Sequence, residues 1–174
     1  MKANKQRGSP ARSVTDRRIR IDLKSQRLDL FEGDRVLASY PVSTAAKGAG
    51  EQEGSEKTPR GLHEIRAMIG AGAPTGAVFA GRRPTGEVCT PETLRAEPER
   101  DWILTRILWL RGLEPGRNRF GNVDTMRRYI YIHGTPHEAA LGTPASHGCI
   151  RMGNADVVEL FDLVEPGVEV EIVG

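Results

Sequence analysis

The sequence has 174 residues, 38% of them hydrophobic and 28% charged, a length and composition that fit one globular domain and exclude a wholly disordered chain. Its 20 glycines and 11 prolines are more than a helical bundle tolerates, so a turn-rich β fold is expected. Two cysteines exclude a disulfide framework, and no apolar run approaches the roughly 18 residues that a membrane-spanning helix needs.

The N-terminal segment is strongly basic. Residues 1–20 contain seven Lys or Arg residues and a single Asp, so the rest of the chain is mildly acidic although the net charge is +2. A basic arm can bind nucleic acid, but this one has no aromatic residues interleaved with its charges. We therefore expect no nucleic-acid partner, a basic disordered tail over residues 1–17, and one folded domain over residues 18–174.

The same segment bears on location. A secretory signal needs an apolar core of roughly 7–15 residues behind its basic start. Here charged and apolar residues alternate instead, as in Ile19-Arg20-Ile21-Asp22. The chain as written is therefore expected in the cytoplasm, with the periplasm or cell envelope as the alternative.

Alternating apolar and polar residues predict the first strands. Residues 18–23 and 27–31 have this period of two, which is typical of a hairpin with one face buried. Residues 36–42 and 62–69 predict further strands. Residues 70–98 contain glycines and prolines without a sustained period, which predicts short strands and loops, and insertions of this kind often overlie binding sites.

Two strongly apolar segments follow. Residues 101–110 (DWILTRILWL) fit either a buried strand or a short helix, and Trp102 and Trp109 are expected to pack in the core. Residues 129–132 (YIYI) predict a central strand that delivers His133 to an edge of the sheet.

The C-terminal segment predicts one helix and one strand. Asn154 is expected to cap a helix whose apolar residues recur at helical spacing over residues 157–164. Residues 168–173 alternate as a last strand. The whole pattern is typical of a mainly β domain with one short helix near its end.

The most informative segment is IHGTP at residues 132–136, followed after a loop by SHGCIRM at residues 146–152. It holds three of the four histidines and one of the two cysteines. An isolated cysteine is usually an inert small hydrophobic residue. A thiol beside an imidazole differs, because only the thiolate attacks a carbonyl and a neighbouring His lowers the thiol pKa from about 8.5 toward neutral. The pattern predicts Cys149 as nucleophile and His133 as its base.

Glycine beside the cysteine adds to this interpretation. Gly148 removes a side chain next to the nucleophile, so the backbone N–H groups of Gly148 and Cys149 can stabilise an oxyanion. Ser146 and His147 complete such a pocket. The alternative is that these residues merely form a turn before the helix.

Zinc binding is the rival chemistry. His133, His137, His147 and Cys149 are four potential ligands. The loop between them is not helical, so His133 and His137 are not held on one face, and no paired cysteines or acidic motif accompany them. We therefore expect no metal site.

Ser146-His147-Gly148-Cys149, preceded by a His at a strand end, resembles the active-site signature of the L,D-transpeptidase (YkuD-type) family. Residues 40–44 (YPVST) and 58–61 (TPRG) resemble earlier elements of that family, and the resemblance covers residues 18–173. It implies a β-sandwich-like catalytic domain, mainly β, with a short helix after the active-site cysteine and with neither metal nor organic cofactor.

The resemblance also implies a reaction. Cys149 would attack the carbonyl of the L-centre of a diamino-acid residue in a peptidoglycan tetrapeptide stem, release the terminal D-alanine and hold the acyl group as a thioester. His133 would be the general base. The other matching positions imply catalytic support from Ser146, His147 and Gly148 and substrate contact from Tyr131, Gly134 and Arg151.

Two positions depart from the family. Arg151 stands where many members have Asn, and its guanidinium can either bind a stem carboxylate or form a salt bridge within the fold. Gly134 stands where Ser is common. If the backbone carbonyl at this position orients the His133 ring, the side chain should not matter.

Three functions are compatible with the motif. A cytoplasmic chain meets soluble wall peptides, so the acyl group is expected to pass to water, as in an L,D-carboxypeptidase of wall-peptide recycling. The alternatives are a transpeptidase that passes it to an amine and a non-catalytic module that binds wall peptides. If the chain is an enzyme, a thiol reagent or carbapenem-like agent should label Cys149 and spare Cys89, and His137 should matter far less than His133.

Overall fold

The computed structural model describes residues 16–174. Residues 1–15 lie outside this range, so the basic disordered tail stays a prediction there. Its predicted end at residue 17 is wrong, because Arg17 begins the first strand and pairs with Glu32. The described chain forms two α-helices, α1 (Pro91–Ala96) and α2 (Asn154–Leu163). It also forms ten strands: β1 (Arg17–Asp22), β2 (Arg27–Glu32), β3 (Arg35–Ser43), β4 (Gly61–Ile69), β5 (Ala77–Ala80), β6 (Arg83–Val88), β7 (Ile103–Gly112), β8 (Tyr131–Gly134), β9 (Ile150–Met152) and β10 (Glu169–Val173).

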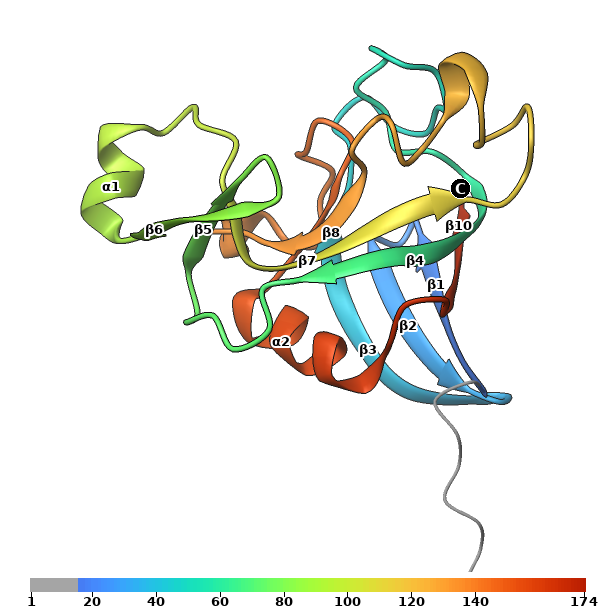
Figure 1. The fold of residues 1–174 in the computed structure, drawn as a ribbon, viewed down its shortest axis with the longest axis horizontal. Coiled ribbons are helices and arrows are strands. Elements are labelled where there is room, and N and C mark those ends of the chain that lie inside the picture. The colour runs from blue at the N-terminus through green and yellow to red at the C-terminus, as the bar shows by residue number, and fades with distance from the viewer. Residues whose placement is uncertain (1–15) are drawn as a thin grey trace, which may run out of the picture.

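All ten strands of the described chain belong to one sheet, in the order β4-β10-β1-β2-β3-β9-β8-β7-β5-β6. β4 also pairs with β7, so the first eight strands of this order close into a ring, and the β5–β6 hairpin extends beyond it (Figure 1). Neighbouring strands are antiparallel except for β1–β10 and β8–β9, which are parallel. The prediction of a mainly β domain with a short helix after Cys149 is confirmed.

The core is built from alternate residues of these strands. In β1, Ile19 and Ile21 are buried while Arg20 between them is exposed, which is the period of two of a strand with one face covered. Leu28 and Leu30 repeat this pattern in β2. The buried face of α2 packs into the same hydrophobic cluster, which ties the helix to the sheet.

β8 and β9 bring the two halves of the sequence motif together. The strands pair in parallel, with His133 opposite Arg151. Side chains two residues apart on a strand share a face. Tyr131 and His133 on β8 therefore face the same side as Arg151 on β9 and Cys149 just before it. Strand pairing, and not the intervening loop, sets this proximity.

Of the two alternatives left open for residues 101–110, the strand is the one observed, as β7 from Ile103 to Gly112. Two other local predictions change. β8 begins two residues later than predicted, because Tyr129 adopts a left-handed backbone conformation (φ 56°) that a strand cannot continue. Gly153, not Asn154, is the N-cap of α2. The Asn154 side chain instead donates to the Thr135 carbonyl at 2.8 Å and so ties the helix to the loop after β8.

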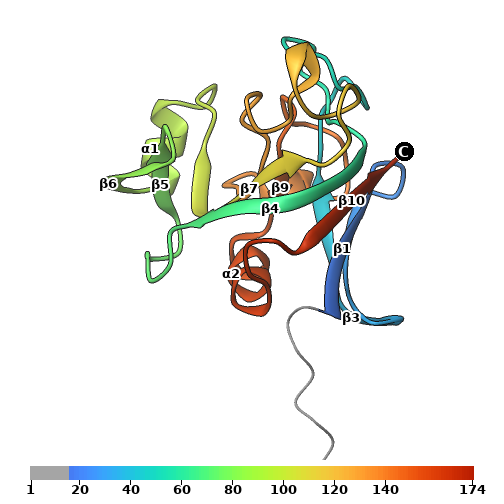
Figure 2. The same cartoon turned by 45° about the vertical axis from the view of Figure 1, so that its right-hand side comes forward.

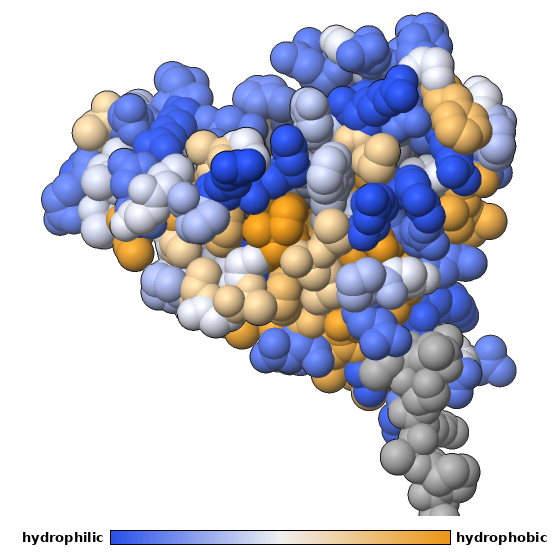
Figure 3. Space-filling model, in the orientation of Figure 1, coloured by the Kyte–Doolittle hydropathy of each residue, from blue (hydrophilic) through white to orange (hydrophobic). Residues whose placement is uncertain are grey.

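Residues 70–98 form β5, β6 and the unpredicted helix α1 at one end of the molecule (Figures 1 and 2). Of the two tryptophans expected in the core, Trp102 is buried near this unit and Trp109 is half-buried. On the face shown in Figure 3, hydrophilic side chains cover the upper rim and apolar side chains gather across the middle, where Figure 1 shows β4 and α2. Within residues 16–174, no helix is long and apolar enough to cross a membrane.

Candidate active site

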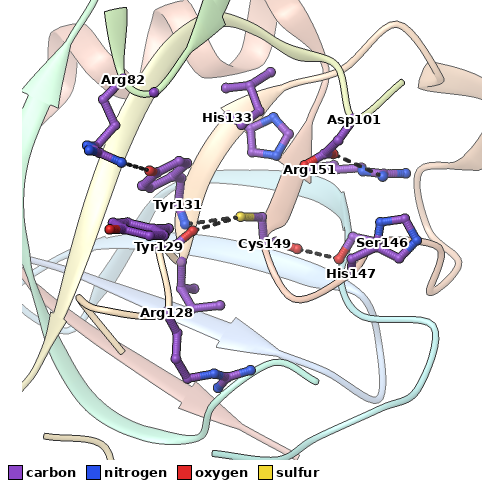
Figure 4. Close-up of a pocket in the computed structure, with 13 residues that line it drawn as sticks. Arg82, Asp101, Arg128, Tyr129, Tyr131, His133, Ser146, His147, Cys149 and Arg151 are labelled. Carbon is purple, nitrogen blue, oxygen red and sulfur yellow. Dashed lines mark hydrogen bonds and ion pairs between the residues drawn. The ribbon is translucent and has the colours of Figure 1, made fainter. Parts of the chain in front are cut away.

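A pocket of about 410 Å³ opens beside β8 and the turn that leads into β9 (Figure 4). Six of the eight predicted site residues line it: Tyr131, His133, Ser146, His147, Cys149 and Arg151. Gly134 and Gly148 are not part of its wall. The wall also contains residues that the sequence did not single out: Gly81, Arg82, Asp101, Ile103, Arg128, Tyr129 and Ile130.

Cys149 sits at the turn before β9. Gly148 precedes it with a φ of 133°, a conformation that favours glycine. The Cys149 Sγ donates to the Tyr129 carbonyl oxygen and accepts from the Tyr131 backbone N–H, both at 3.3 Å. Among the described residues, the sulfur has no hydrogen bond to a side chain, so the resting thiol is held by backbone.

This environment keeps the thiol protonated. Burial raises the pKa of Cys149 to about 12. The Tyr131 N–H and the charges of Arg151 and Arg128 lower this pKa, and the Asp101 carboxylate raises it further. The expectation that a neighbouring imidazole brings the thiol pKa toward neutral is therefore wrong for the resting protein, because desolvation outweighs the favourable contacts. A thiol in this state can act as a nucleophile only if a base removes its proton.

His133 has the geometry of such a base. Its Nδ1 lies 2.7 Å from the Gly134 carbonyl oxygen and donates to it, which leaves the lone pair on Nε2. Burial lowers the pKa of His133, so the ring is neutral at neutral pH. Figure 4 shows the ring in the pocket on the same side as Cys149. A neutral imidazole with an available Nε2 can accept a proton from a thiol.

Gly134 acts on the pocket through its carbonyl and its lack of a side chain. A Cβ at this position would lie 2.4 Å from Asn154 Oδ1 and 2.7 Å from the Leu104 carbonyl oxygen. The expectation that the side chain here should not matter is therefore wrong. Glycine allows β8 to approach β7 and α2 closely, and this packing holds the carbonyl that orients His133.

The turn before Cys149 is fixed from two sides. Ser146 Oγ donates to the Cys149 carbonyl at 2.6 Å and accepts from the Gly148 N–H at 3.2 Å. Thr58 Oγ1 donates to the Gly148 carbonyl at 2.9 Å. The Gly148 amide is thus already engaged, which leaves the Cys149 amide as the available one of the two expected oxyanion donors. Thr58 lies in the TPRG segment, but only the fold reveals its contact with the turn.

Arg151 has partners within the fold. Its guanidinium forms an ion pair with Asp101 at 3.8 Å and donates to the Ala145 carbonyl at 3.4 Å. Of the two roles left open by the sequence, the internal salt bridge is the one observed. Asp101 gave no signal in the sequence, because only the approach of β7 to β8 brings it near β9. His137 lies in a separate polar hollow, which His147 and Arg151 also line.

Two further arginines complete the charged wall. Arg128 is half-buried and donates to the carbonyls of Gly50 (3.2 Å) and Lys57 (2.6 Å), so it ties the loop after β3 to the pocket. Arg82 comes from the hairpin within residues 70–98, the insertion expected to overlie a binding site. Residues of this insertion do line the pocket.

The four residues considered as zinc ligands do not gather. In the part of the chain that the structure describes, no three His, Cys, Asp or Glu side chains lie close enough to hold a metal ion. His133, His147 and Cys149 line one pocket, whereas His137 lies outside its wall. The groups that this pocket brings together include a thiol, two imidazoles and backbone donors.

Comparison with known proteins identifies one family. A model of the L,D-transpeptidase catalytic domain, named YkuD, matches residues 16–172. The protein of Bacillus licheniformis that carries the name L,D-transpeptidase YkuD is 26% identical over 156 residues, which cover 89% of this chain and 64% of that protein.

Solved structures show the same fold. An L,D-transpeptidase from Mycobacterium smegmatis superposes with a TM-score of 0.56 at 17% identity, over 91% of this chain and 59% of that one. The LD transpeptidase LdtMt1 in complex with imipenem gives a TM-score of 0.56 at 18% identity, over 91% of this chain and 59% of that one. Like the Bacillus protein, both are longer, and the chain spans less than two thirds of each.

Proposed function

Since the chain belongs to the L,D-transpeptidase catalytic-domain family, we propose that it forms a thioester between Cys149 and a peptidoglycan peptide stem. The observation that supports this most directly is one pocket that holds a thiol and a histidine whose Nδ1 is fixed by a carbonyl and whose Nε2 is available. The proposed substrate is a tetrapeptide stem. The acyl group comes from the L-centre of its diamino-acid residue, and the leaving group is D-alanine.

The first half-reaction forms the thioester. His133 Nε2 takes the proton of Cys149 as the sulfur attacks the carbonyl carbon. The Cys149 amide, beside His147, stabilises the resulting oxyanion. The C–N bond then breaks, the His133 imidazolium gives its proton to the departing amine, and D-alanine leaves. Cys149 now carries the acyl group, and His133 is neutral again.

The charges around the pocket suit a proton transfer that occurs only with substrate present. Thiol and imidazole are both neutral at rest, because burial disfavours the charged form of each. The Asp101 carboxylate favours the imidazolium that forms in passing, whereas Arg151 opposes it. In this proposal the Arg151–Asp101 pair supports the pocket and tunes His133.

Water is the acceptor that we propose first. His133 takes a proton from water as the oxygen attacks the thioester carbonyl. The C–S bond then breaks, the His133 imidazolium gives its proton to the Cys149 sulfur, and the tripeptide leaves. Hydrolysis requires no second binding site. The activity would then be that of an L,D-carboxypeptidase on wall peptides.

A second hollow supports transfer to an amine as the alternative. It has a volume of about 360 Å³ and shares four residues with the Cys149 pocket, namely Arg128, Tyr129, Ile130 and His147. Glu53, Glu56 and Arg127 also line it. Glu56 pairs with Lys47, so Glu53 is the carboxylate that we propose attracts the ammonium group of a second stem. An amine bound beside the thioester competes with water because it is held in position. The product would be cross-linked peptidoglycan.

Intact-mass spectrometry with a purified tetrapeptide stem tests the proposal. A thioester adduct on Cys149 together with free D-alanine is the expected result. Binding of the stem by calorimetry without any adduct would instead support a non-catalytic module. Imipenem, present in one of the similar structures, is the second probe, and it should acylate Cys149 and not Cys89.

Product analysis separates the two acceptors. Tripeptide as the main product, even with excess amine stem, supports hydrolysis, and a cross-linked dimer supports transpeptidation. Fractionation of cells that carry an epitope-tagged chain tests whether the stems it meets are soluble or wall-bound.

A further inference from the structure

Arg82 occupies an unusual position at the edge of the Cys149 pocket. It forms, with Gly81, the two-residue turn that joins β5 to β6, and both residues have positive φ (53° for Gly81 and 64° for Arg82). Turns of this kind favour Gly, Asn or Asp at both positions. The backbone conformation of the turn therefore does not explain an arginine at this position. The Arg82 side chain instead forms part of the pocket wall (Figure 4).

Three aromatic residues hold the Arg82 guanidinium in place. Its central carbon lies 4.6 Å from the ring centroid of Tyr129 and 4.9 Å from that of Trp109. Its Nη1 donates to the Tyr131 hydroxyl at 3.0 Å. The backbone N–H of Tyr131 is also the donor to Cys149 Sγ, at 3.3 Å. Tyr131, with one hydrogen bond at its backbone N–H and another at its hydroxyl, therefore lies between this cation and the proposed nucleophile.

The three arginines of the pocket differ in what occupies their N–H groups. Arg151 pairs with Asp101. Arg128 directs its N–H groups to loop oxygens, including the Lys57 carbonyl. Within residues 16–174, no carboxylate pairs with Arg82, and its one hydrogen bond goes to a neutral phenol. Arg82 thus keeps its charge and most of its fork of donors available, and this fork matches a carboxylate.

We propose that Arg82 binds the terminal carboxylate of the residue that leaves, which makes it a determinant of substrate choice. This inference rests on the proposed function. When the scissile carbonyl lies at Cys149 Sγ, the carboxylate of the next residue lies within about one extended residue, roughly 3.5 Å of chain, on the leaving side. In this proposal the leaving residue extends through the pocket that Cys149 and Arg82 both line, and its carboxylate approaches the Arg82 donors beside the Tyr131 hydroxyl. A stem that ends one residue after the scissile bond is thereby recognised through its terminal carboxylate.

Two variants and two stems test this assignment. Arg82→Gln should lower kcat/KM for D-alanine release by roughly 10- to 100-fold on a tetrapeptide stem with a free terminal carboxylate, the loss typical of one charge-assisted hydrogen bond. On the same stem with a terminal carboxamide, Arg82→Gln and the wild type should agree within about twofold, because the charge that Arg82 binds is gone. Arg83→Gln is the matched control, since Arg83 is exposed on the same hairpin, and it should match the wild type on both stems.

The outcomes separate recognition from structure. An equal loss on both stems, or no loss on the acid stem, would overturn the assignment. Arg82→Lys keeps the charge but not the fork, and it should show a smaller loss, again on the acid stem only. If Arg82→Gln fails to fold, as judged by thermal melting, Arg82→Lys on the two stems decides the question. A wild-type chain that forms no thioester with either stem would refute the proposed function, and this inference with it.

Discussion

His63 and His133 have closely matched surroundings in two regions of the sheet. Both are buried, and each Nδ1 donates to a glycine carbonyl, that of Gly61 at 3.0 Å and that of Gly134 at 2.7 Å. They differ at Nε2. The Nε2 of His63 accepts from the Thr125 hydroxyl at 2.9 Å, whereas the Nε2 of His133 has no partner among the described residues and lies in the Cys149 pocket.

Neither burial nor charge distinguishes these two rings. Burial lowers the pKa of His63 to about 4 and lowers that of His133 as well, so both are neutral at neutral pH. Both ring nitrogens of His63 have hydrogen-bond partners, so this side chain joins β4 to the segment around Thr125 and has a structural role. A buried histidine is thus a candidate base only where its second nitrogen is left for a reacting group.

Removal of the pocket thiol should have the largest effect, because it takes away the group that distinguishes the His133 region. Cys149→Ala should form no thioester and release no D-alanine from a tetrapeptide stem. Cys89→Ala is the matched control, since Cys89 lies in a separate hollow near α1, and it should keep full activity. Intact-mass spectrometry reads both, and an adduct on the Cys149→Ala chain would refute the assignment.

Replacement of each histidine by Gln should separate the two regions. His133→Gln should slow thioester formation by about 10²–10⁴-fold, the usual loss for a general base. His63→Gln should keep the rate but lose about 1–3 kcal/mol of unfolding free energy, because Gln cannot satisfy both Gly61 and Thr125. His137→Gln should change neither. Time courses of thioester formation give the rates, and urea unfolding gives the unfolding free energies. Similar rate losses for the His63 and His133 variants would contradict the assignment of different roles to the two histidines.

Acid should destabilise the fold through His63. The pKa of His63 is 6.5 in the unfolded chain and about 4 in the folded chain. Between these pH values His63 is protonated in the unfolded chain and neutral in the folded chain. The unfolding free energy should therefore be intact above pH 6.5 and fall by about 3 kcal/mol as the pH drops to 4. His133 acts in the same direction. Urea midpoints over this range should be flatter for His63→Gln, and parallel curves would count against His63.

Alkylation of the wild-type chain involves no variant and reports the protonation state of Cys149 at rest. Because the pKa of Cys149 is raised to about 12, its reaction with iodoacetamide should speed up roughly tenfold per pH unit between pH 7 and 9. A plateau near pH 7 would reveal a thiolate formed at rest. The sequence led us to expect selective labelling of Cys149 by either a thiol reagent or a carbapenem-like agent. With the raised thiol pKa, we now expect it at neutral pH only from an agent such as imipenem, which offers a carbonyl to attack.

The sequence predicted strands best where one face is buried. β1 and β2 alternate because Ile19, Ile21, Leu28 and Leu30 face the core. β7 was ambiguous because it is covered on both faces, and an apolar run without alternation fits a helix equally well. The helix α1 was missed because it is six residues long and has no buried residue, so it leaves no periodic apolar pattern.

The sequence by itself predicted the candidate pair and the local turn. Cys149 and His133 are proposed from residue type and motif, and Gly148 from its position before Cys149, because these are properties of short segments. Only the tertiary structure decided the charge states and partners. The raised thiol pKa, the pairing of Arg151 with Asp101 and the position of Arg82 arise from desolvation and contacts between distant segments. Such effects depend on which elements pack together, and no short segment encodes them.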